Sequence, residues 1–253
     1  MESPVDSAVQ LICASDHAVA LTGAGISTDS GIPDFRSPGG LWSTFPATFG
    51  DYHTFVTHPN QFLELGRTLL PPLLSAVPNE GHKALKRLED LNILQGIITQ
   101  NIDGLHQMGG SRKVIEIHGT YKTATCLQCR RAFTLAELLP LSSSSLVCPH
   151  CSGIIKPDVV MVGESLPEES FSHAVALTQQ ADLMIVAGSS LEVVPASHLV
   201  VLASRNKIPL IILNNTATTL DRLADIILRE RISVCLPHLV TLVRKEVIPC
   251  ESR

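Results

Sequence analysis

Short, almost continuously apolar runs recur along the chain and alternate with longer stretches of helical periodicity. The apolar runs are Ala18–Leu21, Ile97–Thr99, Val114–Ile117, Leu183–Ala187, Pro209–Leu213 and Asp225–Leu228. The helical stretches are Ser7–Ser15, Gly81–Leu91, Glu168–Gln179, Ala196–Arg205 and Leu236–Glu246. Apolar runs without polar alternation are typical of parallel strands that are buried on both faces. The pattern therefore predicts an α/β fold with a Rossmann-type parallel sheet, which binds ligands beyond the carboxyl ends of its strands.

Two segments depart from this alternation, and we interpret both as insertions into the main sheet. Residues 41–78 contain several prolines and aromatic residues, with one helix expected near Gln61–Leu70 and no strand. Residues 121–156 contain four cysteines. The expected units are a Rossmann-type domain from residues 1–40, 79–120 and 157–253, a helical insertion at 41–78 and a small cysteine-rich module at 121–156.

Composition narrows the classes of function. Hydrophobic residues make up 45% and charged residues 17% of the 253 residues, which is typical of a folded domain. The formal charge of −5 argues against sequence-nonspecific nucleic-acid binding as the main function. No apolar run approaches the roughly 18 residues of a membrane span, and the N-terminus lacks the order of a signal peptide. We expect a cytoplasmic monomer with no membrane or direct nucleic-acid partner, whose cysteines are not paired in disulfides.

Four cysteines form two matched Cys-x-x-Cys pairs. Cys126 and Cys129 are separated by 18 residues from the second pair, Cys148 and Cys151. This spacing predicts a closed structural Zn²⁺ site with four thiolate ligands, in a zinc-ribbon module. A redox site is the weaker interpretation, because two pairs are present and neither opens a helix after a strand. We expect His150 to lie on the surface, since four cysteines already fill the coordination sphere.

A glycine-rich turn, Gly23–Gly25, follows the first predicted strand. Gly-x-Gly allows a tight turn in which backbone amides approach a pyrophosphate. The third glycine of the dinucleotide fingerprint is replaced by Thr28, so this turn alone is weak evidence. The next loop, Ser30–Arg36, adds an Asp, an aromatic residue and an Arg, although a solvated turn would equally explain the two charged residues.

Longer motifs resemble one known family. The string GAGISTDSGIPDFR, from Gly23 to Arg36, closely resembles the signature of the sirtuins, as do TQNIDGLH at Thr99–His106 and IHG at Ile117–Gly119. Gly188–Pro195 is similar to a further family motif, and Asn214 stands where the family ends a strand against the adenosine ribose. The motifs are ungapped and in family order, so the resemblance covers nearly the whole chain.

The resemblance implies an NAD-dependent protein-lysine deacylase that consumes NAD as co-substrate and holds one structural Zn²⁺. In such a site the carbonyl oxygen of an acyl-lysine attacks C1′ of the nicotinamide ribose and releases nicotinamide. His118 then acts as general base on a ribose hydroxyl, which attacks the imidate carbon, and water completes the release of lysine and O-acyl-ADP-ribose. From its position alone, His118 could equally be a structural core histidine.

The resemblance also implies the roles of other residues. Asp103 would hold the nicotinamide carboxamide, and Asn101 would position a water and a ribose hydroxyl, so both join His118 as catalytic candidates. From the residues alone, an Asx-turn is an alternative for Asn101 and Asp103. The residues expected to bind NAD are Gly23, Ala24, Gly25, Thr28, Asp34, Phe35, Arg36, Gln100, Asn101, Ile102, Asp103, Gly188, Ser189, Ser190, Asn214 and Ile232.

The segment expected to bind the substrate departs from the family pattern. The family usually has two aromatic residues before Gly-Glu, where this chain has Met161 and Val162. We expect an acyl-lysine peptide to add as a strand between residues 163–166 and 191–194. The acyl tunnel is expected to be wider than usual, unless the flexible Met161 refills it. The residues expected to contact the acyl-lysine substrate are Val160, Val162, Gly163, Glu164, Leu191 and Val193.

Acidic acyl groups are not expected as substrates, because Gly66 and Leu69 stand where family members that favour them have Tyr and Arg. Two other functions could use the same scaffold. Protein ADP-ribosyl transfer or NAD hydrolysis needs the cofactor residues but no peptide groove, so the substrate motifs favour deacylation. A non-catalytic NAD-sensing module would have no need of a general base, so the presence of His118 argues against it.

Overall fold

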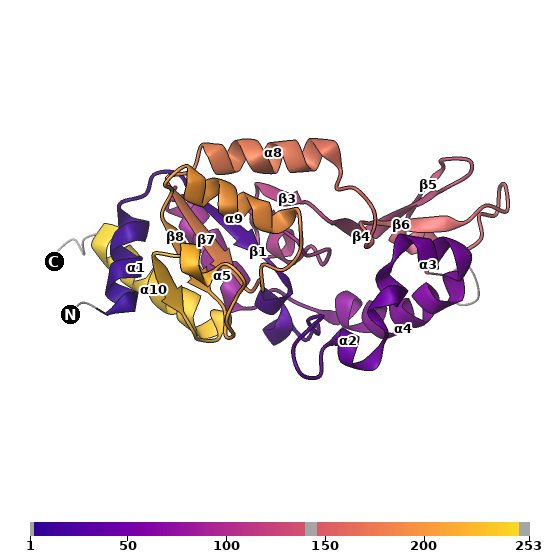
Figure 1. The fold of residues 1–253 in the computed structure, drawn as a ribbon, viewed down its shortest axis with the longest axis horizontal. Coiled ribbons are helices and arrows are strands. Elements are labelled where there is room, and N and C mark those ends of the chain that lie inside the picture. Colours follow the sequence, from indigo (N-terminus) through magenta and orange to yellow (C-terminus); the bar gives the residue numbers. More distant parts are fainter. Residues whose placement is uncertain (1–2, 140–145, 248–253) are drawn as a thin grey trace.

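A large and a small lobe follow one another along the long axis of the computed structural model, which describes residues 3–139 and 146–247 (Figure 1). The large lobe contains a six-stranded sheet of order β3-β2-β1-β7-β8-β9, and every neighbouring pair of strands is parallel. Its strands are β1 Ala18–Thr22, β2 Leu94–Thr99, β3 Val114–Glu116, β7 Leu183–Ala187, β8 Leu210–Leu213 and β9 Ile226–Leu228. From β1 the chain first adds β2 and β3 on one side, and it then returns to add β7, β8 and β9 on the other side. This strand order is the Rossmann arrangement and confirms the predicted fold class.

Helices cover both faces of this sheet. One face packs against α1 Pro4–Cys13, α5 Glu80–Asp90 and α10 Ile232–Val247, and the other against α8 Glu168–Gln179 and α9 Ala196–Arg205. Successive residues of β1 alternate between the faces, with Ala18 and Ala20 in the first core and Val19 and Leu21 in the second. Because both faces are buried along most of the sheet, the middle positions of the strands are apolar and polar residues such as Gln95, Thr99 and Glu116 stand near the strand ends, which explains the apolar runs in the sequence.

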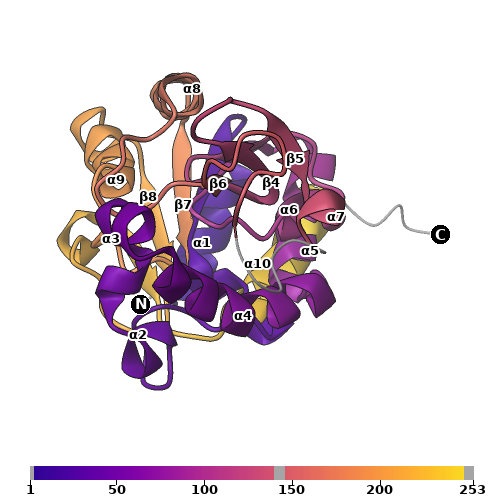
Figure 2. The ribbon, with the colours of Figure 1, turned by 90° about the vertical axis from the view of Figure 1, so that its right-hand side faces the viewer.

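The two insertions together form the small lobe, which faces the viewer in Figure 2. The first contributes α2 Leu41–Thr44, α3 Tyr52–Thr57 and α4 Pro59–Ser75. The second, with two residues before it and three after it, contributes α7 Leu135–Leu138 and a three-stranded sheet of order β5-β4-β6, made of Ala132–Thr134, Gly119–Cys126 and Ile155–Val159. Phe55 and Leu63 of the helices share one apolar core with Phe133, Ile155 and Met161, so the two insertions stabilise each other.

Two helices are longer than expected. The helix expected at Gln61–Leu70 continues through Pro71 and Pro72, and Ala76 N still donates to the carbonyl of Pro72. Burial of Leu73 in a small apolar cluster compensates for the N–H groups that the prolines lack. Helix α10 begins at Ile232 rather than Leu236 because its first turn buries Ile232 and Cys235 against the sheet.

The remaining elements are short and lie in connecting loops: η1 Ala24–Ile26, η2 Thr28–Ser30, η3 Ala47–Gly50, α6 Leu105–Met108 and η4 Asp221–Leu223. Several of them follow the carboxyl ends of sheet strands, where the candidate site lies. Within the described ranges, no helix has both the length and the apolarity that a bilayer crossing requires.

Candidate active site

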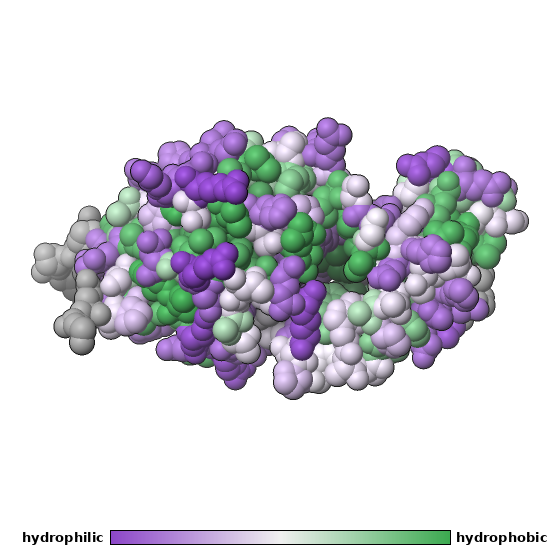
Figure 3. Space-filling model, viewed as in Figure 1, coloured by the Kyte–Doolittle hydropathy of each residue, from purple (hydrophilic) through white to green (hydrophobic). Residues whose placement is uncertain are grey.

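The carboxyl ends of β1, β2, β7 and β8 point toward the small lobe, and the surface is hollowed where the lobes meet (Figure 3). Hydrophobic residues gather around this hollow. The loops that leave these strands carry the predicted motifs, starting at Gly23, Gln100, Gly188 and Asn214. Parallel strands therefore bring together four segments that are far apart in the sequence.

The loops after β1 and β7 cross at very short range. Gly23 N donates to the Ala187 carbonyl at 3.1 Å, and Gly25 N donates to the Gly188 carbonyl at 2.9 Å. A Cβ atom at Gly188 would lie 2.3 Å from Ile26 N, and its φ of +71° favours glycine. The sequence predicted that the backbone amides of Gly23 and Gly25 approach a pyrophosphate. In the structure these N–H groups instead donate hydrogen bonds that join the two loops.

The loop after the glycines is shaped by Asp34. One carboxylate oxygen of Asp34 accepts hydrogen bonds from the backbone N–H groups of Arg36, at 3.1 Å, and Ser37, at 2.8 Å. Phe35 is 38% exposed and packs on Trp42 with ring centroids 5.3 Å apart, so it is not buried under the loop. Arg36 Nε forms an ion pair at 3.0 Å with Glu192, which belongs to the loop after β7.

His118 lies just beyond β3, where its ring is held by the loop after β2. Its Nδ1 is 2.9 Å from the Gln100 carbonyl oxygen, and a carbonyl can only accept. Nδ1 must therefore carry the proton, which leaves Nε2 of the neutral ring as the basic nitrogen. Burial lowers the pKa of His118 below its usual value, against the opposing effect of the Gln100 hydrogen bond. Gln100 Nε2 in turn donates to Ser189 Oγ at 2.9 Å.

Asn101 and Asp103 are buried in a polar cluster that is centred on Ser27. Asn101 Nδ2 donates to Ser27 Oγ at 3.1 Å and to the Gly23 carbonyl at 3.2 Å. Ser27 Oγ donates to one carboxylate oxygen of Asp103 at 2.7 Å, while the other oxygen accepts from Leu105 N at 2.9 Å. The contact with Leu105 is the Asx-turn that the sequence allowed for Asp103. The contact with Ser27 adds a hydrogen bond to a residue far away in the sequence.

Two buried histidines behind this cluster were not predicted as site residues. His82 Nε2 lies 3.4 Å from Ser27 Oγ, His106 Nε2 lies 2.9 Å from Thr22 Oγ1, and the two rings are 4.9 Å apart. Burial is the main cause that lowers the pKa of His82 to about 4 and that of His106 to about 3, so both are neutral at physiological pH. His106 belongs to the TQNIDGLH motif, which was the available signal, whereas His82 was recognisable only as one of ten histidines.

A cavity of about 170 Å³ lies between η2 and the start of α10. Its lining brings together five of the predicted NAD-binding residues, which are Gly25, Thr28, Asp34, Asn214 and Ile232. The hydroxyl and amide groups of this lining are suited to ribose hydroxyls, and Arg231 forms an ion pair with Asp29 of the same lining. Four other predicted residues, Ala24, Ile102, Ser189 and Ser190, lie on the adjoining loops.

The predicted substrate segment joins the two lobes. Val160 N donates to the His118 carbonyl at 2.8 Å, and Val162 exchanges backbone hydrogen bonds with residues 50 and 52. Met161 is 4% exposed because its side chain belongs to the small-lobe core, whereas Val162 is 64% exposed. Glu164 accepts from Met161 N at 2.9 Å and forms an ion pair with Lys156 at 3.0 Å, so its carboxylate stabilises the turn at Gly163.

The opposite wall of the proposed peptide site follows β7. Leu191 is buried with φ +59°, and Val193 is half-buried. Leu191 N donates to Ser189 Oγ at 3.3 Å, which connects this wall to Gln100 and hence to His118. The segments at 163–166 and 191–194 are irregular in the structure and lie outside its regular strands.

The four predicted metal ligands come together in the small lobe. The Sγ atoms of Cys126, Cys129, Cys148 and Cys151 all lie within 4.8 Å of one another, with separations of 3.5 and 3.8 Å for two of the pairs. Zn–S bonds of about 2.3 Å in a tetrahedron give sulfur separations of about 3.8 Å, so the residues fit zinc. His150 is exposed and contacts Arg131, as expected of a surface residue.

The pKa values of the thiols show how strongly the four sulfur atoms affect one another. The backbone N–H of Cys129 is the main cause that lowers the pKa of Cys126 to about 6. For Cys151 the Gly153 N–H stabilises the thiolate, but burial and the other thiols outweigh it and raise the pKa to about 12. Crowded thiols thus resist full deprotonation unless a metal compensates their charge. Of the other cysteines, Cys13 is half-buried and Cys235 buried, and Cys250 lies outside the described residues.

Comparisons with known proteins place these features in context. The family model described as the Sir2 family matches residues 23–195. The NAD-dependent protein deacetylase of Sulfolobus acidocaldarius is 41% identical over 234 residues, which are 92% of this chain and 92% of that protein. The NAD-dependent protein deacetylase of Thermotoga maritima is 40% identical over 220 residues, which are 86% and 89% of the two chains.

Solved structures agree with the sequence relatives. A structure described as Sir2 with p53 peptide and NAD⁺ superimposes with a TM-score of 0.87 at 36% identity, over 97% of this chain and 98% of that one. Another, from work on the mechanism and regulation of Sir2 enzymes, gives a TM-score of 0.90 at 34% identity, over 97% and 100% of the two chains. The similarity thus includes both lobes.

Proposed function

Because the chain belongs to the Sir2 family, we propose that it removes acetyl and longer apolar acyl groups from protein lysines, with NAD as co-substrate. The relatives described above are NAD-dependent protein deacetylases, and one solved Sir2 structure contains both a p53 peptide and NAD⁺. The observation that carries the proposal is His118, whose hydrogen bond to the Gln100 carbonyl leaves Nε2 as a base beside the polar cluster of Asn101 and Asp103.

Bound NAD supplies a ribose with a nicotinamide leaving group, and the residues of this chain supply orientation and a base. His118 is neutral over the physiological range because burial lowers its pKa, so it can accept a proton without first losing one. Asn101 and Asp103 are held by Ser27, which keeps their amide and carboxylate in a fixed geometry. Gln100 connects the base to the loop after β7, where we place the peptide.

The zinc site has a structural part in this proposal. The four cysteines belong to the sheet module of the small lobe, and Cys126 and Cys148 are buried in the core that also holds Met161. A closed site with four protein ligands keeps no open position for a substrate. Zinc would therefore support the substrate segment at Val160–Glu164 through the shared core and take no part in the chemistry.

Mass spectrometry of the products tests the proposed reaction. Incubation with NAD and an acetyl-lysine peptide should yield the free-lysine peptide, nicotinamide and an O-acetyl-ADP-ribose. Free ADP-ribose without peptide deacylation would indicate NAD hydrolysis, and a peptide heavier by an ADP-ribosyl group would indicate transfer. Binding of NAD without any product would support a sensing module, and each of these three results would contradict the proposal.

The breadth of acyl preference rests on Val162 and Met161. Met161 is packed among Phe55 and Leu63, so its side chain is held in the small-lobe core. That position supports a tunnel that Met161 does not refill, and valine at 162 occupies less volume than the aromatic ring usual in the family. An apolar pocket discriminates each methylene by about 1 kcal/mol, so added width changes the preferred chain length.

We therefore expect Val162→Phe to change the choice of acyl group. The wild-type enzyme should accept butyryl- and longer acyl-lysine at least as well as acetyl-lysine in one peptide. The variant should lower kcat/KM for the longer chains by about fivefold or more relative to acetyl, because a ring refills about one methylene or more of width. Val56→Phe is a matched control at an exposed position of α3. An unchanged ratio of long to short chains in Val162→Phe would show that other residues set the tunnel width.

A further inference from the structure

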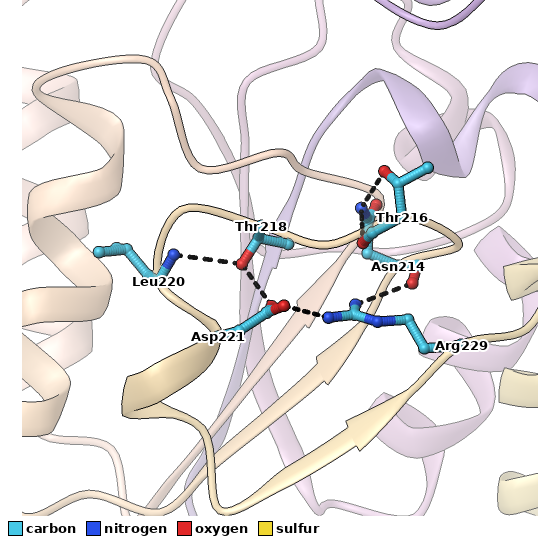
Figure 4. A network of polar contacts seen from close by, with 6 residues as sticks. All are labelled: Asn214, Thr216, Thr218, Leu220, Asp221 and Arg229. Carbon is cyan, nitrogen blue, oxygen red and sulfur yellow. Dashed lines mark hydrogen bonds and ion pairs between the residues drawn. The ribbon is translucent and has the colours of Figure 1, made fainter.

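An arginine at the end of β9 holds the loop that follows β8. Arg229 Nη1 donates to the Asn214 carbonyl oxygen at 3.0 Å, and Nη2 forms an ion pair with Asp221 (Figure 4). Asp221 uses its other carboxylate oxygen to accept from Thr218 Oγ1 at 2.7 Å. Both ends of residues 214–221, which we call the β8 loop, are therefore connected through one guanidinium group.

The same network orients the Asn214 side chain. Asn214 Nδ2 donates to the Thr216 carbonyl at 2.9 Å and lies 3.2 Å from Thr216 Oγ1. Across the described part of the chain, no group donates a hydrogen bond to Asn214 Oδ1, and the residue lines the 170 Å³ cavity. The amide is thus fixed on its donor side and retains an acceptor for a hydroxyl group of a ligand.

The far side of the β8 loop contacts the proposed peptide wall. Thr219 N donates to the Ser190 carbonyl at 3.2 Å, and Thr219 Oγ1 donates to the Leu191 carbonyl at 2.8 Å. Leu191 has a positive φ of +59°, a conformation that a branched side chain seldom adopts without support. One short loop therefore contacts both the cavity proposed for the adenosine ribose and the wall proposed for the peptide.

Partial burial makes these contacts stronger than those of an ordinary surface pair. The side chains of Arg229 and Asp221 are 33% and 24% exposed, respectively, and each makes a second hydrogen bond inside the loop. A bridge that combines an ion pair with hydrogen bonds to backbone has a defined geometry, which isolated exposed pairs lack. Loss of the guanidinium would free the Asn214 carbonyl and leave Asp221 without its cation.

We infer that Arg229 and Asp221 are positioning residues, which hold the β8 loop so that Asn214 meets NAD and Thr219 supports the peptide wall. The inference rests on the proposed function. It makes the β8 loop the physical link between the two substrates, so that each substrate strengthens the binding of the other by the same factor. Neither Arg229 nor Asp221 needs to touch a reacting atom for this role.

Calorimetric titration with NAD alone tests the first half of the inference. Arg229→Gln should weaken NAD binding by about five- to tenfold, as expected for a partly exposed, charge-assisted contact. Arg229→Lys should recover part of the affinity because it restores the ion pair, and Asp221→Asn should weaken binding in the same direction. Arg112→Gln breaks an ion pair with Glu89 whose arginine side chain is 72% exposed, and it should leave NAD binding unchanged. Wild-type affinity in folded Arg229→Gln and Asp221→Asn would overturn the inference.

The KM for NAD at low and at saturating acetyl-lysine peptide tests the second half. In the wild-type enzyme, saturating peptide should lower this KM by about fivefold or more. Thr219→Val removes the hydrogen bond to the Leu191 carbonyl and should bring that factor close to one. A coupling factor in Thr219→Val equal to that of the wild type would overturn the link. Absence of deacylation by the wild-type protein would instead refute the proposed function, so the two failures are distinguishable.

Discussion

The role that we propose for His118 depends on a hydrogen bond from its own ring to the main chain. The Gln100 carbonyl accepts from Nδ1, which leaves Nε2 with its lone pair, and burial lowers the pKa so that the ring stays neutral. His82 and His106 also have a ring nitrogen without a hydrogen-bond partner, but both rings are fully buried. His118 is only half-buried, and within the described ranges no hydrogen-bond partner of its Nε2 is found. An unpaired nitrogen on a half-buried ring favours the catalytic interpretation.

Replacement of His118 by alanine should reduce kcat by a factor of about 10²–10⁴, the usual contribution of a general base. NAD affinity should stay within about twofold of the wild type, because the base acts only after the cofactor is bound. His173→Ala removes an exposed histidine and serves as control. A His118→Ala enzyme that kept more than about a tenth of the rate would indicate that another residue is the base.

The pH profile gives a second check on the same residue. A base is active in its neutral form, and burial lowers the pKa of His118 below the usual 6.5. The acid limb of kcat/KM should therefore have its midpoint below pH 6.5, since the ring stays neutral to lower pH than a free histidine. A limb centred above that value would contradict a buried neutral base.

At the scale of elements, the crossing of the loops after β1 and β7 shows why a glycine is required. At Gly188 the backbone of the β1 loop occupies the space where a side chain would lie, with Ile26 N 2.3 Å from an added Cβ. At Gly39, φ is also positive, at +84°, but no atom lies within 4 Å of an added Cβ. Replacement of Gly39 by alanine therefore introduces only backbone strain, whereas the same change at Gly188 also introduces a steric clash.

We expect Gly188→Ala to lower the free energy of unfolding and to weaken NAD binding by about tenfold or more, because the β1 loop must move away. Gly39→Ala should cost only about 1 kcal/mol, the strain of a positive φ in a non-glycine residue. Urea denaturation and calorimetric NAD titration measure the two effects. Equal losses in the two variants would show that the close approach of the loops contributes nothing.

The zinc module is the second element whose stability can be tested separately. Cys148 is buried, and its Sγ lies 3.8 Å from that of Cys129. We expect one zinc per chain by elemental analysis, loss of that zinc in Cys148→Ser, and a lower Tm because bound metal contributes folding free energy. Cys13→Ser, at a half-buried position far from the metal-ligand set, should retain zinc. A zinc-free wild-type protein of full stability would refute the site.

At the scale of the whole molecule, the buried histidines make stability depend on pH. The folded-state pKa values of His82 and His106 are about 4 and about 3, below the value of 6.5 expected in the unfolded chain. As the pH falls below 6.5, these histidines take up protons in the unfolded state but stay neutral in the folded state. The free energy of unfolding that they contribute is therefore fully present above pH 6.5 and is lost progressively below it.

Between the unfolded and the folded pKa value of each histidine, the free energy of unfolding should fall by up to about 1.4 kcal/mol per pH unit as the pH is lowered. His106→Gln keeps an N–H donor for Thr22 but removes one titrating ring, so its unfolding free energy should fall less steeply between about pH 6.5 and pH 5. Urea denaturation across this range measures the slope, and the exposed His173→Gln is the control. The same slope in His106→Gln and the wild type would contradict the burial of a neutral His106.

Local pattern was enough to predict the large lobe and the metal site. The strands could be recognised because the middle of a strand that is buried on both faces is almost always apolar, a constraint that acts on each segment separately. The four zinc ligands were readable because two short cysteine pairs meet the geometry of one ion. The motif around His118 likewise placed a histidine at a strand end. In each case the information lies within a few neighbouring residues.

Other features depend on residues that only folding brings together. The shared core of the two insertions, the histidines behind Ser27 and the guanidinium bridge of Arg229 join segments separated by about 15 to 100 positions, and no short pattern marks them. The sequence by itself determined the sheet, the zinc ligands and the family. The tertiary structure alone decided that Gly23 and Gly25 use their N–H groups to join two loops, because the shortest backbone contacts arise only where distant loops cross.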